Sequence, residues 1–400
     1  MIFHIDMDSY FASVEQQANP ALIGKNIVVS GKEGSRTVIV AASKEAKRFG
    51  VKTAMATFQA RKLCPDLIFV EPDGKKYWEV NRKFVEIFER FTDKVELFSI
   101  DEAFLDMTGY AKTFSEAREK ALSIKKMMRQ EIGEVVTCSF GIARNKFLAK
   151  LGSDLNKPDG IVVINEKNKI NVLNRCQLSD FCGIGRRIES RLEMMGIETV
   201  LKLREYPLEH LIKEFGPFYG QKLRSMANGE DDALVLSENS QVAKSVSRAY
   251  TMSSDTFNKK DILQLLLILS EKCGRELRSS GQAGKTVEIF FRYDDFSHAS
   301  LRVTSTGYIS DGLQIYKIGE RKILNFRLPK AVRLVGVRVS NLVENYTQLP
   351  LWHIERKRFQ LVSSLDKIND KYGEFTIKPG FLLKSKRLRD KIGGFKFETD

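Results

Sequence analysis

Two short acidic clusters lie at the ends of strand-forming segments. Asp101 and Glu102 interrupt the largely apolar run 97–106, and Asp6 follows the strand-like segment Ile2–Ile5. Neighbouring side chains of a regular strand point to opposite faces, so Asp101 and Glu102 can share a ligand only where the chain bends, at a hairpin tip or a bulge. Carboxylates at the ends of apolar strands suit a hard divalent cation such as Mg²⁺. Taken alone, either cluster could equally be a cap or a surface turn.

Length and composition limit the class of protein. The chain has 400 residues, of which 42% are hydrophobic and 29% charged, so we expect a folded protein of roughly two to four domains. The net charge of +14 favours a polyanionic partner, nucleic acid before an anionic membrane. No apolar run is long enough to span a bilayer and no basic-then-apolar leader occurs, so we expect a cytoplasmic protein without a membrane partner.

Cysteine and histidine usage argues against a disulfide framework and against zinc. The five cysteines are odd in number and never spaced as CxxC, and the four histidines do not cluster. We expect reduced cysteines in the core. They are Cys64, Cys138, Cys176, Cys182 and Cys273.

The spacing of apolar residues predicts a small α+β domain in the first 165 residues. Strands are expected at 2–5, at 25–30 and 37–40 (a hairpin), at 136–142 (half-buried) and at 161–164. Helices are expected after a Ser or Asp cap near residue 9 and at 43–50, 57–63, 75–91, 116–134 and 145–156. Strand, helix, hairpin, helix, strand is the order of a sheet with helices on one face.

A Gly-x-Gly turn opens a helix further along the chain. Gly183 and Gly185 precede Arg186 and Arg187. The outward N–H groups of such a turn, beside two guanidinium groups, suit a phosphate of a nucleic-acid backbone. An ordinary helix–turn–helix contact fits the same motif. A looser copy follows at 215–222, and the polar segment after it indicates a linker.

Beyond the linker the pattern predicts a second α+β module. Strands are expected at 244–250, 287–292, 301–306 and 332–339, and helices at 261–279 and 312–325. Cations on several strands indicate either a solvated outer face or a sheet laid against a phosphate backbone. The candidate DNA contacts here are Lys244, Ser245, Arg248, Arg333 and Arg338.

Several motifs together resemble one family. They are Asp6-Met7-Asp8-Ser9-Tyr10-Phe11, Ser99-Ile100-Asp101-Glu102-Ala103, the segment 139–146 and the turn 156–160. In this order, over about residues 1–340, the chain resembles the Y-family translesion DNA polymerases, in particular the bacterial DinB type. The combination is specific, although each motif alone is not.

The resemblance implies an α+β multidomain fold, a right-hand polymerase with an added little-finger domain. The implied palm covers 1–10 and 73–165, the fingers 11–72 and a helical thumb with a helix-hairpin-helix 166–230. A linker at 231–243, an α+β little finger at 244–341 and a tail at 342–400 follow. The implied activity is low-fidelity, templated addition of deoxynucleotides to a primer 3′ end.

The resemblance also implies the site residues. Asp6, Asp101 and Glu102 would be catalytic and would hold two Mg²⁺ ions together with the Met7 carbonyl. Phe11 would be the steric gate that excludes a ribose 2′-hydroxyl. The nucleotide would also contact Tyr10, Lys44, Lys47, Arg48 and Lys157.

The fingers depart from the family pattern at three positions. Ala41, Lys44 and Lys47 stand where the family usually has Ser or Thr, Tyr and Arg. Lysine is a point charge without the bidentate fork of arginine, so we expect triphosphate binding with a different geometry. Arg48 could replace the missing guanidinium.

The tail carries one further motif. Gln348, Leu349, Leu351 and Trp352 form the pattern of a sliding-clamp-binding peptide, with two apolar anchors. A proline-containing linker with its Trp against the domain is the alternative. An amphipathic helix is expected after this peptide, and a basic run covers 384–391.

Three hypotheses follow for function. The first is an error-prone translesion DNA polymerase, a monomer whose partners are primer–template DNA, deoxynucleoside triphosphates and a sliding clamp. The second is a catalytically inactive, polymerase-shaped scaffold that binds the clamp. The third is a nucleotidyl cyclase with a palm-like domain, which also uses strand-borne carboxylates and two metals.

Overall fold

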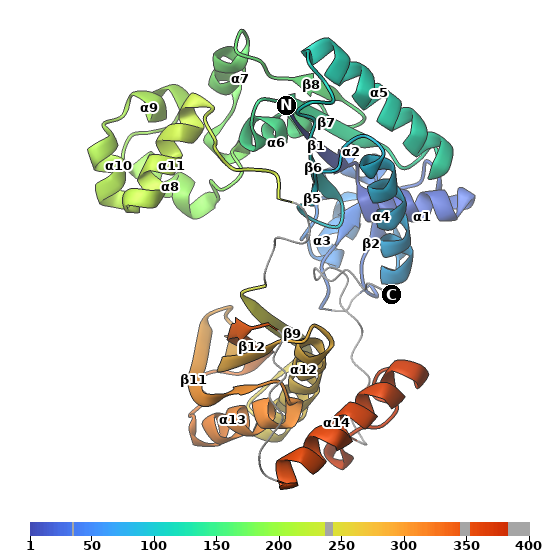
Figure 1. Ribbon diagram of the computed structural model, residues 1–400, viewed down its shortest axis with the longest axis vertical. Helices are drawn as coiled ribbons and strands as arrows, with labels where there is room; N and C mark the ends of the chain where they lie inside the picture. The colour runs from blue at the N-terminus through green and yellow to red at the C-terminus, as the bar shows by residue number, and fades with distance from the viewer. Residues whose placement is uncertain (34–35, 237–242, 345–352, 383–400) are drawn as a thin grey trace. The chain divides into compact units, whose positions relative to one another are not determined.

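The protein is described from a computed structural model, which covers residues 1–33, 36–236, 243–344 and 353–382 (Figure 1). These residues form two compact units, one ending at residue 236 and the other beginning at residue 243. The predicted clamp-binding peptide and the basic run at 384–391 lie outside the described residues. Among the helices that are described, none has the length and apolar character needed to cross a membrane.

A five-stranded sheet forms the centre of the first unit. Its strands, in spatial order, are β5 (Val95–Leu97), β6 (Glu102–Asp106), β1 (Ile2–Met7), β7 (Cys138–Ala143) and β8 (Ile161–Val163). The central strand β1 pairs antiparallel with β6 and with β7, and β8 runs parallel to β7. The acidic segments of the sequence therefore come from adjacent strands.

Helices cover both faces of this sheet. Phe3 of β1 packs on one face in a core shared with α4 (Gly74–Glu89) and α5 (Phe114–Glu131). Phe104 of β6 packs on the other face in a core shared with α6 (Lys146–Leu155). The expectation of helices on one face only is therefore wrong. For the same reason β7, expected to be half-buried, is buried along its whole length.

A glycine permits the close approach of α6 to the sheet. A Cβ atom at Gly141 of β7 would lie 1.8 Å from the carbonyl oxygen of Ala149 and 2.5 Å from the backbone nitrogen of Ser153. No side chain fits in that space. The absence of one lets α6 lie close to β7, and α6 carries Lys150 and leads into the Lys157 turn.

The region predicted as fingers contains a three-stranded sheet and short helices. The elements are α1 (Tyr10–Ala18), β2 (Ile27–Val29), β3 (Ala41–Ala42), α2 (Lys44–Arg48), α3 (Thr57–Leu63) and β4 (Ile68–Val70). The predicted hairpin is displaced, because β2 pairs with β3 and residues 37–40 form no strand. β2 also pairs parallel with β4.

The start of α1 differs from the prediction. Ser9 precedes the helix at φ 51°, in the left-handed region, and its side chain makes no capping hydrogen bond. The predicted Ser or Asp cap is therefore wrong, because the Asp8 carboxylate bonds to other partners. α2 is capped as its sequence suggests, since the Ser43 hydroxyl accepts a hydrogen bond from the Ala46 N–H.

Five further helices complete the first unit. They are α7 (Lys169–Arg175), α8 (Arg186–Met194), α9 (Val200–Glu205), α10 (Leu208–Phe215) and α11 (Pro217–Asn228). Helices α8, α9, α10 and α11 lie together in Figure 1. Their core includes Leu192, Leu203 and Leu223.

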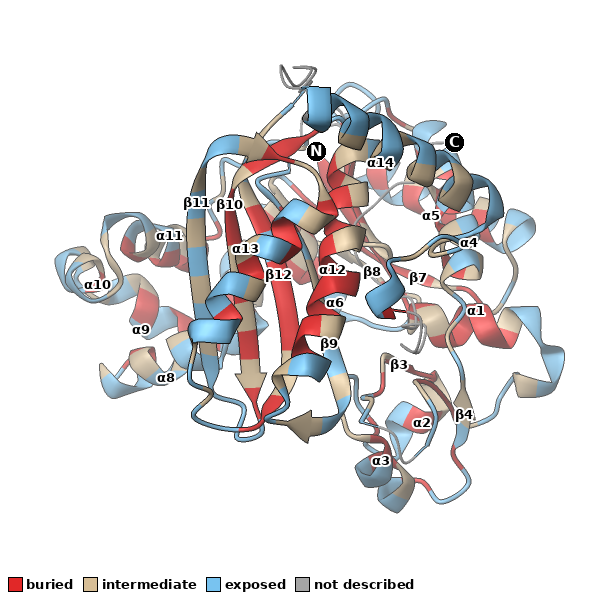
Figure 2. Ribbon diagram, turned by 90° about the horizontal axis from the view of Figure 1, so that it is seen from below, coloured by how far each residue is buried: buried red, intermediate tan, exposed pale blue. Residues whose placement is uncertain are grey.

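The second unit is a four-stranded antiparallel sheet with helices on one face (Figure 2). Its elements are β9 (Ser245–Thr256), α12 (Lys259–Ser279), β10 (Ala283–Tyr293), β11 (His298–Ile309), α13 (Gly312–Asn325), β12 (Val332–Val343) and α14 (His353–Tyr372). The strand order is β11-β10-β12-β9. α14 is attached to α12 by ion pairs, including Arg278–Asp366 at 2.6 Å, and the segment just after α14 is attached by Lys272–Glu374 at 2.6 Å.

All five cysteines are free of disulfide bonds in the structure, and four of them are buried. Cys182, in the Gly-x-Gly turn, is exposed, so the prediction that all five lie in the core is wrong for this residue.

Candidate active site

The register of the central strands brings the two acidic clusters together. Asp6 of β1 lies directly opposite Glu102, the first residue of β6. The Met7 N–H donates to the Asp101 carbonyl at 2.9 Å, one position beyond the strand pairing. The chain bends sharply before β6, where the N–H groups of Phe98 and Ser99 both donate to the Glu102 carbonyl. The bend that the sequence required between β5 and β6 is therefore present.

Polar contacts hold the tip of this hairpin in place. Asn81 of α4 is buried, and its amide donates to the Ile100 carbonyl at 2.8 Å. The Ser99 hydroxyl donates to the Asp101 carboxylate. These bonds restrict the rotation of the Asp101 side chain beside Asp6. Neither contact has a pattern that sequence reasoning could have found.

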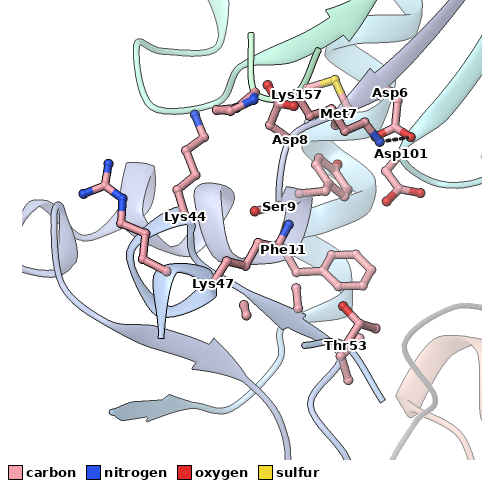
Figure 3. Close-up of a pocket in the computed structure, with 16 residues that line it drawn as sticks. Asp6, Met7, Asp8, Ser9, Phe11, Lys44, Lys47, Thr53, Asp101 and Lys157 are labelled. Atoms are coloured by element: carbon pink, nitrogen blue, oxygen red, sulfur yellow. Dashed lines mark ion pairs between the residues drawn. The ribbon is translucent and has the colours of Figure 1, made fainter. Parts of the chain in front are cut away.

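Lysines from α6 and the turn after it neutralise the acids. Lys157 forms an ion pair with Asp6 at 2.7 Å, which Figure 3 shows as a dashed line, and a second with Asp154 at 2.7 Å. Lys150 pairs with Glu102 at 2.8 Å. Burial opposes the charge on Lys157, but Asp6 and Asp154 outweigh burial and raise its pKa.

The carboxylates, of which Asp6 is buried and Asp101 and Glu102 are partly buried, repel one another. Burial, and then the neighbouring Glu102 carboxyl, raise the pKa of Asp6 to about 7. Burial also raises the pKa of Asp101, with a further contribution from Asp6 and an opposing one from its bond with Ser99. Like charges held in a poorly solvated corner favour either a proton or a nearby cation.

The donor set fits a hard divalent cation. Among the described residues, no three acidic, histidine or cysteine side chains converge on one point as they stand, since Asp6, Asp101 and Glu102 each bond to other side chains. Their oxygens are nevertheless the ligand type that Mg²⁺ prefers, and the charge on Asp6 is already balanced by a cation.

A cavity of about 650 Å³ opens from this corner (Figure 3). Asp6, Met7 and Asp101 line one end, while α2 contributes Lys44, Lys47 and Arg48, and Lys157 projects from the turn after α6. The volume is within the range of small-molecule sites. Burial, and then the nearby Lys157, lower the pKa of Lys47. The cavity therefore combines clustered acids with clustered cations, which suits a ligand that is itself polyanionic and metal-bound.

Phe11 and Tyr10 line the same cavity but differ in role. The Phe11 ring stacks on Tyr77, with ring centroids 4.4 Å apart and an interplanar angle of 28°, and it remains partly exposed to the cavity. Tyr10 is buried, and its hydroxyl donates to the Tyr77 carbonyl at 2.6 Å. Phe11 is therefore held rigidly where it can exclude atoms, whereas the Tyr10 hydroxyl is not free for a ligand.

Two further residues that line the cavity concern the positions at which residues 41–47 differ from the family pattern. Ala41 lines the cavity, so the position that lacks a hydroxyl does face the ligand space. Thr53 also lines it and supplies a hydroxyl from the segment after α2 (Figure 3). Thr53 lies in a non-periodic loop, so sequence analysis gave no reason to select it.

The predicted DNA contacts of the first unit are exposed. Gly185 precedes α8, and Gly183 adopts φ 111°, a conformation that favours glycine. The Gly183 carbonyl accepts a hydrogen bond from the Tyr219 hydroxyl, which ties the two glycine-containing turns together. Arg186 and Arg187 are exposed and, within the described residues, form no ion pair.

The predicted cations of the second unit do not share one face. Register places Ser247, Arg338, Glu288 and Arg302 in one row on the face that α12 and α13 leave open. Arg338 pairs there with Glu288 at 3.1 Å. Arg248 instead shares a face with buried Val246, and it pairs with Glu276 of α12.

The other candidates lie at the ends of strands. Lys244 and Ser245 are exposed at the start of β9. Arg333 lies at a register shift of β12, with Asp255 at 4.0 Å. Arg338 and Lys244 are thus better placed for an external partner than Arg248.

Comparison with known proteins agrees with this architecture. Residues 5–154 match a family model described as impB/mucB/samB family, and residues 243–351 match the C-terminal domain of that family. Residues 179–231 match a model described as DNA polymerase-iota, thumb domain.

Curated relatives align along nearly the whole chain. A DNA polymerase IV from Desulfatibacillum aliphaticivorans is 36% identical over 394 residues, covering 96% of this chain and 97% of that protein. A DNA polymerase IV from Clostridioides difficile (strain 630) is 36% identical over 88% of this chain and 96% of its own length.

Solved structures with a similar fold are also DNA polymerases. A Y-family DNA polymerase chimera of Dbh has a TM-score of 0.77 and 27% identity, covering 86% of this chain and 99% of that one. An insertion ternary complex of Dbh DNA polymerase has a TM-score of 0.59, 26% identity and the same coverage. The chain therefore belongs to the Y-family DNA polymerases. Within that family, its similarity over most of its length is to proteins named DNA polymerase IV.

This membership confirms the predicted fold class and activity class. The chain is a DNA-directed DNA polymerase of the low-fidelity, translesion kind, built as a right hand with a thumb and an added C-terminal sheet domain. The hypothesis of a nucleotidyl cyclase is wrong, because the relatives named as polymerases span both units.

Proposed function

We propose that the cavity is the nucleotide-binding active site of this polymerase and that Asp6, Asp101 and Glu102, with the Met7 carbonyl, hold two Mg²⁺ ions. The observation that carries the proposal is the convergence of Asp6 and Asp101 at one end of a cavity whose other walls bear Lys44, Lys47 and Lys157. When bound, the ions would supply an activated primer 3′-hydroxyl and neutralise charge on the triphosphate.

The residues of this chain would bind and orient the substrates. Lys44, Lys47, Arg48 and Lys157 would hold the triphosphate, as point charges at three of these four positions. Lys157 is paired with Asp6 at 2.7 Å, and arrival of a triphosphate and its metal would give both groups new partners. Charge that develops on the phosphoryl oxygens would then meet fixed cations in a partly desolvated site.

Removing one carboxylate tests the metal-binding role. We expect Asp101→Asn to lower primer extension with Mg²⁺ by about 10³-fold, because it removes one charged ligand while it keeps the shape of the side chain. Primer–template affinity should stay within about twofold of wild type, measured by fluorescence anisotropy.

Asp106→Asn is the matched control, since Asp106 ends β6, the strand that Asp101 directly precedes, and pairs with the N-terminus and Lys94 rather than lining the cavity. Equal extension by Asp101→Asn and the control would contradict the assignment. A wild-type chain that binds DNA without extending it would favour the inactive-scaffold hypothesis.

Phe11 is proposed as the steric gate. Its ring lines the cavity and is held by Tyr77, so it would occupy the space next to the sugar of a bound nucleotide. We expect Phe11→Ala to raise ribonucleotide incorporation relative to deoxynucleotide incorporation by roughly 10–200-fold, measured as a ratio of kcat/KM values. Phe58→Ala, which removes an exposed ring of α3 outside the cavity, should leave the ratio unchanged. An unchanged ratio in Phe11→Ala would exclude the gate role.

The second unit is proposed to contact the DNA backbone through the open face of its sheet. Arg338 lies on that face, whereas Arg248 is turned toward α12. We expect Arg338→Ala to weaken primer–template binding and to reduce the slope of log affinity against log salt by about 1. Arg248→Ala should leave the salt slope unchanged. The opposite ranking of these two variants would refute the open face as the contact surface.

The clamp-binding role of Gln348, Leu349, Leu351 and Trp352 is proposed from the sequence, as is a monomeric state. Two apolar anchors in a short peptide, which lies in the sequence between β12 and α14, suit a pocket on a sliding clamp. We expect deletion of 348–352 to abolish stimulation by the clamp of the same organism and to spare distributive synthesis, measured by primer extension with and without the clamp. Full stimulation after the deletion would show that the peptide is a linker.

A further inference from the structure

Asp8, two residues after the metal-binding candidate Asp6, lies in an unusual environment for an acid beside a polyanion site. Its side chain is 4% exposed. One carboxylate oxygen accepts from the Ser139 hydroxyl at 2.8 Å. The other accepts from the Thr137 hydroxyl at 2.7 Å and from the Asp159 N–H at 2.8 Å. Three donors thus hold this carboxylate in a fixed hydrogen-bond network.

One branch of this network leads to the fingers. The Lys44 ammonium donates to the Thr137 hydroxyl at 2.8 Å, and that hydroxyl donates to Asp8. Lys44 begins α2, and Thr137 lies just before β7. The hydrogen-bond chain therefore fixes the amine of a cavity lysine against the palm sheet, across a sequence separation of 93 residues.

The other branch leads to Lys157. Asp159, whose N–H bonds to Asp8, is two residues from Lys157 in the same turn. The Asp159 side chain in turn accepts from Lys125 at 2.8 Å and from Arg129 at 2.6 Å, both on α5. The turn is therefore anchored from α5 on one side and from Asp8 on the other.

We propose that Asp8 is a positioning residue that sets the places of Lys44 and Lys157 together, and thereby the geometry of triphosphate binding; this rests on the function proposed above. Asp8 lines the same cavity as the two lysines, and its hydrogen bonds go to Thr137, Ser139 and Asp159. Its buried negative charge strengthens the hydrogen bonds from Thr137 and Asp159, since bonds to an ionised acceptor are stronger than neutral ones. A lysine is flexible and lacks the fork of arginine, so an external anchor is needed to place it.

This hydrogen-bond network gives a structural reason for Lys44, a position at which the chain differs from the family pattern. Lys44 stands where the family usually has a tyrosine, and a tyrosine would bring its own rigid hydroxyl. The structure gives the longer, flexible lysine a fixed partner in Thr137 instead. Lys44 and Thr137 thus act as one unit, tied through Asp8 to the Lys157 turn.

The test measures nucleotide affinity without chemistry. The full-length protein is bound to a primer–template whose primer ends in a dideoxynucleotide, and the dissociation constant of the correct dNTP is measured with Mg²⁺. We expect Asp8→Asn to raise that constant by about tenfold, because an amide offers one acceptor where the carboxylate offers two. Thr137→Val keeps the shape but loses the hydroxyl, and should raise the constant by about threefold.

A double-variant cycle separates positioning from a general loss of structure. In a Lys44→Ala/Lys157→Ala background, the two lysines that Asp8 would position are gone, so Asp8→Asn should change the constant by less than about twofold. Glu131→Gln is the matched control, because it removes a carboxylate that pairs with Arg90 on the exposed side of the same domain. Primer–template affinity, measured in parallel, reports whether each variant folds.

The outcomes show separately whether the positioning role of Asp8 fails and whether the proposed triphosphate-binding site fails. If Lys44→Ala/Lys157→Ala leaves dNTP affinity unchanged, the proposed triphosphate site is wrong. If that variant weakens binding but Asp8→Asn does not, or weakens it equally in both backgrounds, the positioning role of Asp8 is wrong. If Asp8→Asn loses DNA binding, the test uses Thr137→Val instead. If Thr137→Val weakens dNTP binding in the wild-type background but not in the Lys44→Ala background, the proposal is supported. If Thr137→Val weakens dNTP binding in both backgrounds, the proposal is overturned.

Discussion

Buried like charges at the end of the central strands are the constraint on which this structure depends. Pairing of β1 with β6 sets Asp6 opposite Glu102, and the bent hairpin adds Asp101 beside them. Repulsion among carboxylates in a desolvated corner costs free energy unless a cation or a proton compensates. The lysines that follow from α6 supply that compensation, and the path of α6 across the sheet depends in turn on the bare backbone of Gly141.

The same electrostatics connect the resting site to the reaction of a Y-family polymerase. In the function proposed above, metal ions would take the place of Lys157 beside Asp6, and Lys157, which lines the cavity, would be available to a triphosphate. Asp8 accepts hydrogen bonds from the Thr137 hydroxyl and the Asp159 N–H. Through these two donors it connects Lys44 of α2 and the Lys157 turn to the central sheet. Metal binding and nucleotide binding are thereby linked through a few short-range contacts.

Much of the site could be predicted because its signals are local. The interruption of an apolar run by Asp101 and Glu102 required a bend, and the structure has one. The role of Asp8 could not be predicted, since its partners lie more than 120 residues away and are ordinary hydroxyl and amide groups. The sequence analysis missed the helices on the second face of the sheet because β7, although buried along its whole length, alternates larger and smaller side chains. That alternation is also typical of a half-buried strand. Arg248 was selected for its charge, but strand parity decides which face a cation occupies, and it places Arg248 on the face toward α12.

The most direct measurement is a crystal structure of the full-length protein with primer–template DNA, a non-hydrolysable dNTP analogue and Mn²⁺, examined by anomalous scattering. The account predicts two manganese peaks bounded by Asp6, Asp101 and Glu102, with Lys157 moved from Asp6 onto the triphosphate. Manganese bound elsewhere, or Lys157 still paired with Asp6 beside a bound nucleotide, would contradict it.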